Sequence, residues 1–199
     1  MYSVLLSRIN TSFQLIENRL KEIIKKTDNV VIIPWTFAKE IDADNLDKYF
    51  SNSKKDKYVN SLLKIGIDEN NITILNCYRD TDEYMKEKIK NSNILVLPGG
   101  NPEMLYNKIL EHNLLNTIKN YNKTIIGESA GTELQLNNYF ITRKNNYYKK
   151  FAWYQGFGIL DDLFYLDVHS SNNYRYINKL KKYLLKKVKL SMQFMMMEL

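Results

Sequence analysis

The 199-residue sequence contains one cysteine, Cys77, and only two histidines. A single cysteine excludes an intramolecular disulfide and a cysteine-based zinc site, and two histidines cannot form a histidine-rich metal site. No apolar run approaches the roughly 20 residues that a membrane-spanning helix needs. The first residues, MYSVLLSRIN, have no basic segment before their short apolar run and so do not resemble a signal peptide. We therefore expect a cytoplasmic protein without a metal site or a membrane partner.

Acidic residues are fewer than basic ones, 22 Asp and Glu against 29 Lys and Arg, which gives a net charge of +7. Such an excess suits either an anionic partner such as nucleic acid or a solvated, lysine-rich surface. The lysines are spread over several segments, and the largest cluster, KLKKYLLKKVK at residues 179–189, alternates Lys with Leu and Tyr at helical spacing. This spacing is typical of the outer face of a packed helix. We therefore favour the solvated surface and expect no nucleic-acid partner.

Short apolar runs alternate with helical patterns along most of the chain. The runs lack polar alternation, as expected for parallel strands that are covered on both faces. They lie at residues 3–6, 30–34, 72–75, 94–98 and 124–127. Apolar residues recur every three or four positions in the segments between them, at residues 13–26, 47–64, 82–90 and 102–119. This order predicts an α/β fold with a mainly parallel sheet flanked by helices on both faces.

The pattern changes after Leu136. Residues 138–160 are aromatic and polar and suit either a hairpin or an excursion beside the sheet. Residues 163–169 then predict a further strand, and residues 174–185 a helix. No linker or internal repeat is evident in the sequence. We expect one domain over residues 1–199, with an atypical C-terminal end from about residue 186, where the methionine-rich SMQFMMMEL follows the helix.

Glycine is scarce as well, with seven residues, yet two of them flank Ser129 in TIIGESAG. An apolar run, the motif G-x-S-x-G and a helical stretch together form the pattern of a nucleophile elbow. Such a turn exposes the serine hydroxyl, and the two glycines avoid collisions with the neighbouring strand and helix. An ordinary tight turn is the alternative, because the motif alone is a weak signal. The Ala130 amide could stabilise an oxyanion, and a second turn at Gly99 and Gly100 could complete the oxyanion hole.

A serine nucleophile needs a base, and the sequence offers two histidines. His112 lies in ILEHNLLN at the junction of two helical segments, where a surface or capping role is the simpler interpretation. His169 ends the predicted strand 163–169, and a histidine at the end of a strand shares the rim of the sheet with Ser129. We therefore predict His169 as the general base, with a structural histidine as the alternative.

The segments LPGGNPEML, IIGESAGTEL, QGFGIL and LDVHSS together resemble the dipeptidase E and cyanophycinase family of serine peptidases. The resemblance extends from about residue 4 to residue 185 and implies a class I glutamine amidotransferase-like fold, with serine where the amidotransferases use cysteine. It implies a cofactor-free cytoplasmic hydrolase of small peptides, and the best-known member cuts dipeptides that begin with aspartate. By motif match, Ser129 is the nucleophile, His169 the base, and Gly100 and Ala130 the oxyanion donors.

Two further residues are candidates for substrate binding. Asn101 follows the glycine turn, and Arg175 could hold an acidic substrate group in a bidentate contact, although an ordinary surface arginine explains it equally well. The expected partner is a small peptide. The oligomeric state stays open, with a homodimer as one option.

One departure from the family concerns the third member of the triad. The family places an acidic residue between the serine motif and QGFG, whereas residues 134–155 contain neither Asp nor Glu. Asp167 would share a strand face with His169 but lie roughly 6–7 Å along it, which favours a structural role. The leading hypothesis is a serine-type peptidase that is slow or uses a neutral orienting group. The alternative is a family member without catalysis that acts as a binding or interaction protein.

Overall fold

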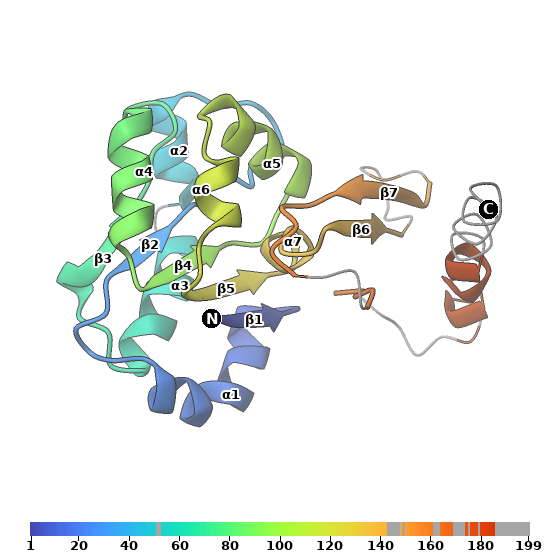
Figure 1. Ribbon diagram of the computed structural model, residues 1–199, viewed down its shortest axis with the longest axis horizontal. Helices are drawn as coiled ribbons and strands as arrows, with labels where there is room; N and C mark the ends of the chain where they lie inside the picture. Colours follow the sequence, from blue (N-terminus) through green and yellow to red (C-terminus); the bar gives the residue numbers. More distant parts are fainter. Residues whose placement is uncertain are drawn as a thin grey trace, which may run out of the picture. The chain divides into compact units, whose positions relative to one another are not determined.

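The computed structural model describes residues 1–50, 53–142, 148, 150–160, 164–168, 174, 176–178 and 180–185. Five parallel strands form its main sheet, in the order β1-β5-β4-β2-β3 (Figure 1). They are β1 (Tyr2–Leu6), β2 (Val30–Ile32), β3 (Ile72–Ile74), β4 (Ile94–Leu97) and β5 (Thr124–Glu128). Each of the first five predicted strands is present, so the predicted parallel sheet is confirmed.

Helices cover both faces of this sheet. In Figure 1, α1 (Ile9–Ile23) and α3 (Ser53–Lys64) lie below it, whereas α4 (Asp82–Asn91), α5 (Pro102–Glu111) and α6 (Leu115–Lys119) lie above it. Alternate strand residues face the lower helices because side chains of a strand point to opposite faces. The strand residues of this core cluster include Val30, Ile32, Ile94, Val96 and Ile126, and the helix residues include Phe13, Leu20, Val59 and Leu62.

Two of the predicted helices are each divided in the structure. The predicted helix 47–64 is α2 (Ala43–Phe50) followed by α3, and the predicted helix 102–119 is α5 followed by α6. The second division occurs where Asn113 takes a left-handed conformation with φ 53°, which an α-helix cannot continue through. An apolar spacing of three to four residues continues across the second break, so the sequence pattern did not reveal it, whereas the first break coincides with the polar stretch SNSKKDK at residues 51–57.

The chain beyond the main sheet contains a second, two-stranded sheet of β6 (Asn138–Ile141) and β7 (Ala152–Gln155). The predicted strand at residues 163–169 is wrong for its described part, because residues 164–168 have no strand conformation. Trp153 contacts the Tyr165 ring edge-on at 4.9 Å between centroids, so this apolar run packs through its aromatic side chains without strand pairing.

The chain divides into two compact units, residues 1–140 with 153–168 and residues 141–152 with 169–199. In the second unit, the described residues between 174 and 185 are helical, in agreement with the predicted helix. The Phe151 and Tyr183 rings stack there with their centroids 4.1 Å apart. None of the helices that the structure describes is both long and apolar enough to cross a membrane.

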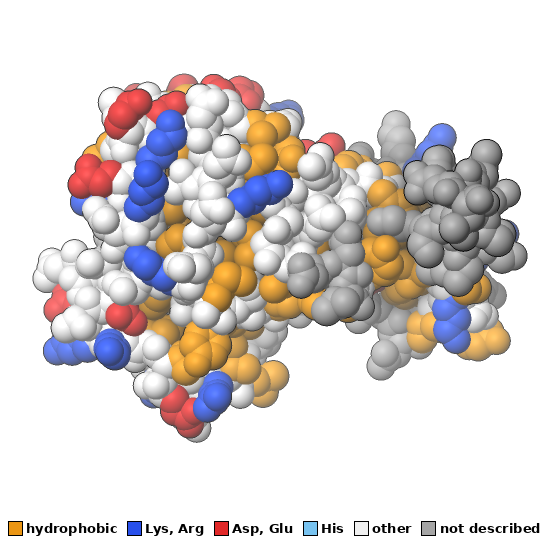
Figure 2. Space-filling view, viewed as in Figure 1, with side chains coloured by type: hydrophobic (Ala, Val, Ile, Leu, Met, Phe, Trp, Pro, Cys, Tyr) orange, Lys and Arg blue, Asp and Glu red, His pale blue; other side chains and the backbone are white. Residues whose placement is uncertain are grey.

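Lysine and arginine side chains do not gather into one patch on the face shown in Figure 2. They are interspersed there with acidic and uncharged side chains.

Candidate active site

Ser129 lies at a sharp turn from strand to helix. It follows β5 directly and precedes the short helix α7 (Ala130–Glu133), with φ 48° and ψ −105°. Few residues other than glycine adopt a positive φ. The Ser129 amide donates to the Leu6 carbonyl at 2.8 Å, and its own carbonyl accepts from the Thr132 and Glu133 amides at 2.9 Å each. The strained turn that G-x-S-x-G predicts is therefore confirmed.

The two glycines of the motif are required by close backbone packing. A Cβ atom on Gly131 would lie 1.9 Å from the Leu97 carbonyl oxygen, at the end of the adjacent strand β4. A Cβ atom on Gly127 would lie 2.4 Å from the Gly131 carbonyl oxygen. Both separations are far below a van der Waals contact, so only glycine fits at either position. The turn around Ser129 is thus packed directly against the carboxyl end of β4.

The turn at Gly99 and Gly100 follows β4 and lies against the same elbow. Strands β4 and β5 pair in parallel, with Leu97 opposite Gly127. A Cβ atom on Gly99 would lie 3.0 Å from a Glu128 carboxylate oxygen. Gly100 has φ 147°, in the region that favours glycine. The predicted second turn is therefore adjacent to the residue that precedes Ser129.

Glu128 occupies the centre of a buried polar network. Its side chain accepts hydrogen bonds from the Ile9 amide at 2.9 Å, from Lys57 Nζ at 2.5 Å and from the Tyr58 hydroxyl. Tyr58 in turn accepts a hydrogen bond from the Gly99 amide at 2.9 Å. Glu128 is 5% exposed, so these groups replace the water that an exposed carboxylate would bind.

The network fixes the protonation of both Glu128 and Tyr58. Burial alone would raise the pKa of the Glu128 carboxyl, but hydrogen bonds from Lys57, Tyr58 and the Ile9 amide outweigh it, and the pKa lies below its ordinary value of 4.5. Burial and then the charge of Glu128 raise the pKa of the Tyr58 hydroxyl above its ordinary value of 10.0. At neutral pH the Glu128 carboxylate is therefore ionised and accepts the hydrogen bond that the Tyr58 hydroxyl donates.

The sequence matches peptidase family S51 over residues 5–191. The chain belongs to this family. Its fold is similar to that of a protein named as a peptidase E from Listeria monocytogenes EGD-e, with a TM-score of 0.57 and 16% sequence identity over 79% of this chain and 74% of that one. A peptidase from an acI-B1 actinobacterium aligns with a TM-score of 0.48 and 17% identity over 79% of this chain and 63% of that one. No match is found among curated proteins.

The family assignment confirms the resemblance seen in the sequence and places the protein among the peptidases. The similarity to the Listeria protein supports the fold alone, because the two sequences are only 16% identical. The family and this likeness agree with the parallel sheet flanked by helices that the structure shows.

The structure describes only some of the remaining residues that the sequence predicts for the site. His169 and Arg175 lie outside the described residues. Asn101 caps α5, since its side-chain oxygen accepts from the Glu103 and Met104 amides at 3.0 and 3.3 Å. Because residues 164–168 form no strand, the strand spacing used to relate Asp167 to His169 does not apply.

His112 has the capping position that the sequence suggests. It is the C-cap of α5, and its Nδ1 lies 2.8 Å from Asp82 Oδ1 at the start of α4. This hydrogen bond is the main reason that the pKa of Asp82 lies below its ordinary value. The imidazole also packs at 5.6 Å from the Trp35 ring. His112 thereby joins the ends of two helices.

A competing nucleophile and a metal site find no support in the described part of the chain. Cys77 is buried, and burial raises the pKa of its thiol to about 12. A thiol with so high a pKa is a poor nucleophile. Within the same described ranges, no group of three His, Cys, Asp or Glu side chains could hold a metal ion.

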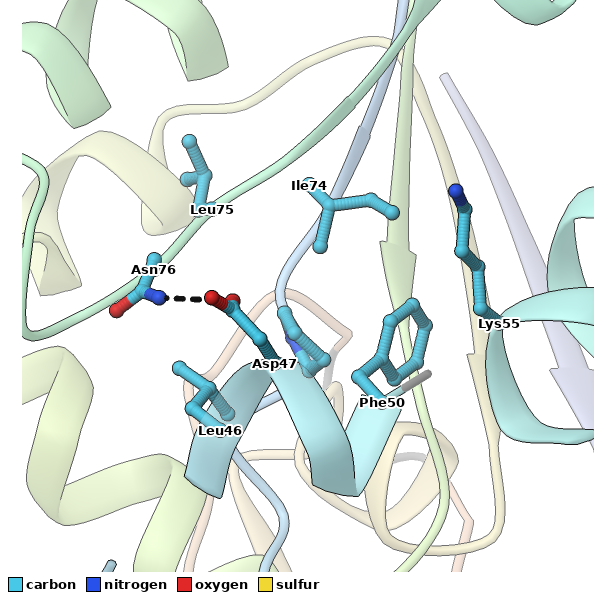
Figure 3. A pocket seen from close by; sticks show the side chains of 8 residues that line it. Leu46, Asp47, Phe50, Lys55, Ile74, Leu75 and Asn76 are labelled. Atoms are coloured by element: carbon cyan, nitrogen blue, oxygen red, sulfur yellow. Dashed lines mark hydrogen bonds between the residues drawn. The ribbon is translucent and has the colours of Figure 1, made fainter. Parts of the chain in front are cut away.

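A cavity of about 280 Å³ opens at the carboxyl ends of β2 and β3. Figure 3 shows Phe50 and Ile74 between a hydrogen-bonded pair, Asp47 and Asn76, and the Lys55 side chain. Strand β4 separates β2 from β5 in the sheet, and Ser129 is not among the residues that line this cavity. The cavity therefore does not contain the predicted nucleophile, and the candidate active site is the turn at Ser129.

Sequence reasoning missed Thr36, Lys57 and Tyr58. Thr36 lies 63 residues from Gly99, to which it donates a hydrogen bond, and Tyr58 lies 41 residues from Gly99. Thr36 lies in the segment VVIIPWTFA, which resembles the family's second strand, but nothing in the sequence gives any of the three a role at the site, and only the folded chain brings them there. The position of Glu128 inside G-x-S-x-G was the one available signal that a charged side chain would be buried there.

Proposed function

We propose that the protein is a serine-type peptidase that hydrolyses small peptides, with Ser129 as nucleophile and His169 as general base. The strained conformation of Ser129, in a chain of peptidase family S51, is the observation that carries this proposal. Strain of this kind is concentrated at functional sites, because it persists only where the surrounding structure enforces it. Ordinary strand-to-helix turns do not require it.

The proposed reaction is acyl transfer in two steps. His169 removes the proton of the Ser129 hydroxyl as its oxygen attacks the carbonyl carbon of the scissile peptide bond. The amides of Gly100 and Ala130 stabilise the resulting oxyanion. His169 then gives the proton to the departing amine, which leaves an acyl-enzyme. Water, activated by the same histidine, hydrolyses the ester and restores Ser129.

The proposed substrate has an acidic first residue, with Arg175 as the group that binds its carboxylate. A guanidinium forms two parallel hydrogen bonds with a carboxylate, which suits recognition of aspartate. Asn101 is a weaker candidate for substrate contact, since its side-chain oxygen already caps α5.

A second candidate function is binding without catalysis. The observation in its favour is the absence of Asp and Glu from residues 134–155, where the family places its third triad residue. A chain that lost this acid could retain the peptide site and bind peptides without cleaving them.

A fluorophosphonate probe distinguishes the two functions, because it reacts with activated serines. We expect native protein to be labelled at Ser129, with labelling lost on denaturation and in Ser129→Ala. Ser61→Ala is a matched control, since Ser61 lies in α3 and donates to the Lys57 carbonyl. Hydrolysis of the dipeptide Asp-Leu is measured in parallel. Absence of both labelling and hydrolysis in folded protein would favour the binding function.

A further inference from the structure

Three hydrogen bonds to the buried residues Thr36 and Tyr58 hold the turn that follows β4. The Thr36 hydroxyl donates to the Gly99 carbonyl at 2.8 Å, and the Thr36 carbonyl accepts from the Asn101 amide at 2.8 Å. The Tyr58 hydroxyl accepts from the Gly99 amide at 2.9 Å. Thr36 and Tyr58 are 2% and 3% exposed, so the residues that hold this half-buried turn are themselves shielded from water. The peptide groups on either side of Gly100 are thus fixed by buried partners.

The Gly100 amide is different, because it donates to no protein acceptor among the described residues. Its direction nevertheless follows from Thr36. In a trans peptide group the Gly99 carbonyl and the Gly100 N–H point in opposite directions. Since the Thr36 hydroxyl holds that carbonyl, the Gly100 N–H points away from Thr36. A Cβ atom on Gly100 would lie 2.3 Å from the Thr36 carbonyl oxygen, so no larger residue could take this place.

The orientation of Tyr58 is fixed in its turn by Glu128. An ionised carboxylate can only accept hydrogen bonds, so Tyr58 must use its single proton for Glu128. The lone pairs of the hydroxyl oxygen then face the Gly99 amide. Because Glu128 directly precedes Ser129, one network joins the glycine turn to the strand that presents the serine.

We propose that Thr36 and Tyr58 are positioning residues that aim the Gly100 amide at the oxyanion formed when Ser129 attacks its substrate. This inference rests on the proposed function, since it requires Ser129 to be the nucleophile. An amide that is already oriented needs no reorganisation as negative charge develops on the substrate oxygen. The uncharged ground state gains less from the same amide, so loss of this positioning lowers kcat more than it changes KM.

Kinetics of Thr36 variants test the catalytic part of the proposal. Thr36→Val replaces the hydroxyl with a methyl group of similar size. We expect kcat for Asp-Leu to fall about tenfold, less than the roughly 10²–10³-fold loss on removal of a whole oxyanion donor. KM should stay within about threefold, and Thr36→Ser, which keeps the hydroxyl, should recover most of kcat. An unchanged kcat, or a change confined to KM, in folded Thr36→Val overturns the proposal.

Tyr121→Phe is the matched control. Like Thr36→Val, it removes a hydroxyl from a buried side chain, in this case the Tyr121 hydroxyl, which lies 3.0 Å from Ser92 Oγ. Ser92 and Tyr121 precede β4 and β5, so this hydrogen bond lies at the amino ends of the strands, opposite the elbow. We expect Tyr121→Phe to retain the wild-type kcat. A loss equal to that of Thr36→Val would show that the effect is general and would overturn the proposal.

The Gly100 amide signal tests the positioning without any turnover. In ¹H–¹⁵N spectra, Thr36→Val should shift the Gly100 signal while Thr36→Ser and Tyr121→Phe leave it in place. An unchanged Gly100 signal in folded Thr36→Val overturns the inference whatever the activity. If Ser129 is labelled and required for hydrolysis but Thr36→Val keeps full kcat, the inference alone falls. If no peptide is cleaved and Ser129 is not labelled, the proposed function falls, and the catalytic role of Thr36 and Tyr58 falls with it.

Discussion

Ser129 holds backbone dihedral angles that a residue with a side chain adopts only at a cost. Strain of this kind amounts to about 1–3 kcal/mol. It persists because the Leu6 carbonyl fixes the Ser129 amide and the first turn of α7 fixes its carbonyl. The absence of a side chain at Gly131 then lets the helix lie directly against Leu97 at the end of β4. The sequence motif and its surroundings therefore act together, and the serine alone would not keep this geometry.

The strain can be measured by comparing two substitutions that both remove the hydroxyl. Ser129→Gly relieves the clash of Cβ with the backbone, whereas Ser129→Ala keeps it. After the entropic cost of glycine in the unfolded chain, we expect Ser129→Gly to be about 1 kcal/mol more stable than Ser129→Ala. Urea denaturation of the two variants gives this difference.

A helical serine provides a control with the opposite sign. Ser61 lies inside α3, where glycine is about 1 kcal/mol less favourable than alanine. Ser61→Gly should therefore be the less stable of its pair. If Ser129→Ala were as stable as Ser129→Gly, the strain at Ser129 would be no larger than the entropic cost of glycine, and the prediction would be wrong.

At the scale of elements, Glu128 connects four parts of the fold. It ends β5, accepts from the amide that begins α1, binds Lys57 and Tyr58 of α3, and through Tyr58 reaches the turn after β4. A single buried carboxylate thus holds the carboxyl edge of the sheet together. Loss of its charge should loosen all four parts at once.

Glu128 should make the stability of the protein depend on pH in acid. Its pKa is lower in the folded protein than its ordinary value of 4.5, so its contribution is fully present above that value and is lost as pH falls through the folded pKa. Glu128→Gln should reduce the free energy of unfolding by about 2 kcal/mol at pH 7, and the difference from wild type should narrow below pH 4.5. Urea denaturation at several pH values measures both effects.

Glu17→Gln is the control for this measurement. Glu17 pairs with Lys21 on the surface of α1, and that hydrogen bond lowers the pKa of Glu17 as well. Because the pair is solvated, its effect on stability should be much smaller. A difference between wild type and Glu128→Gln that is the same at every pH would contradict an ionised Glu128.

The strands of the main sheet could be predicted from the sequence because their chemistry is local. Residues 94–98 are apolar throughout, and residues 124–127 are apolar or glycine after Thr124, as a strand buried on both faces requires. An apolar run predicts burial, however, and not hydrogen bonding to another strand. Residues 163–169 show the difference: Phe164 is 43% exposed, and its neighbour Tyr165 packs on Trp153 without pairing.

At the scale of the whole molecule, the candidate site depends on contacts between distant segments. Ser129 and the glycine turn could be predicted because each lies in a short motif and parallel strands end at one rim. Thr36 and Tyr58 could not, since their contacts with Gly99 exist only after the sheet and α3 have packed. Burial of the Glu128 side chain also depends on its contacts with α1 and α3, and no local sequence pattern specifies those contacts.

The segment in which the family has its third triad residue contains no acid in this chain. The family places its acid in a part of the chain where residues 143–151 carry only Arg, Lys, Asn, Tyr and Phe. Positive charge near His169 would disfavour the imidazolium that forms during turnover. Removal of a triad carboxylate reduces turnover by about 10⁴-fold in other serine enzymes. We therefore expect hydrolysis of Asp-X dipeptides to be weak compared with a relative that has a complete triad.

Tyr148→Glu should raise this activity, because it places an acid roughly where the family has one. Lys150→Glu is the control, since it adds an acid to the same segment two residues away. The measurement is kcat/KM for Asp-Leu in wild type, Ser129→Ala and the two glutamate variants. We expect the gain only in Tyr148→Glu, because an acid orients an imidazole through a direct hydrogen bond and not through net charge alone. Strong wild-type turnover that Ser129→Ala abolishes would show that a neutral group or a distant acid suffices and that the enzyme is not impaired.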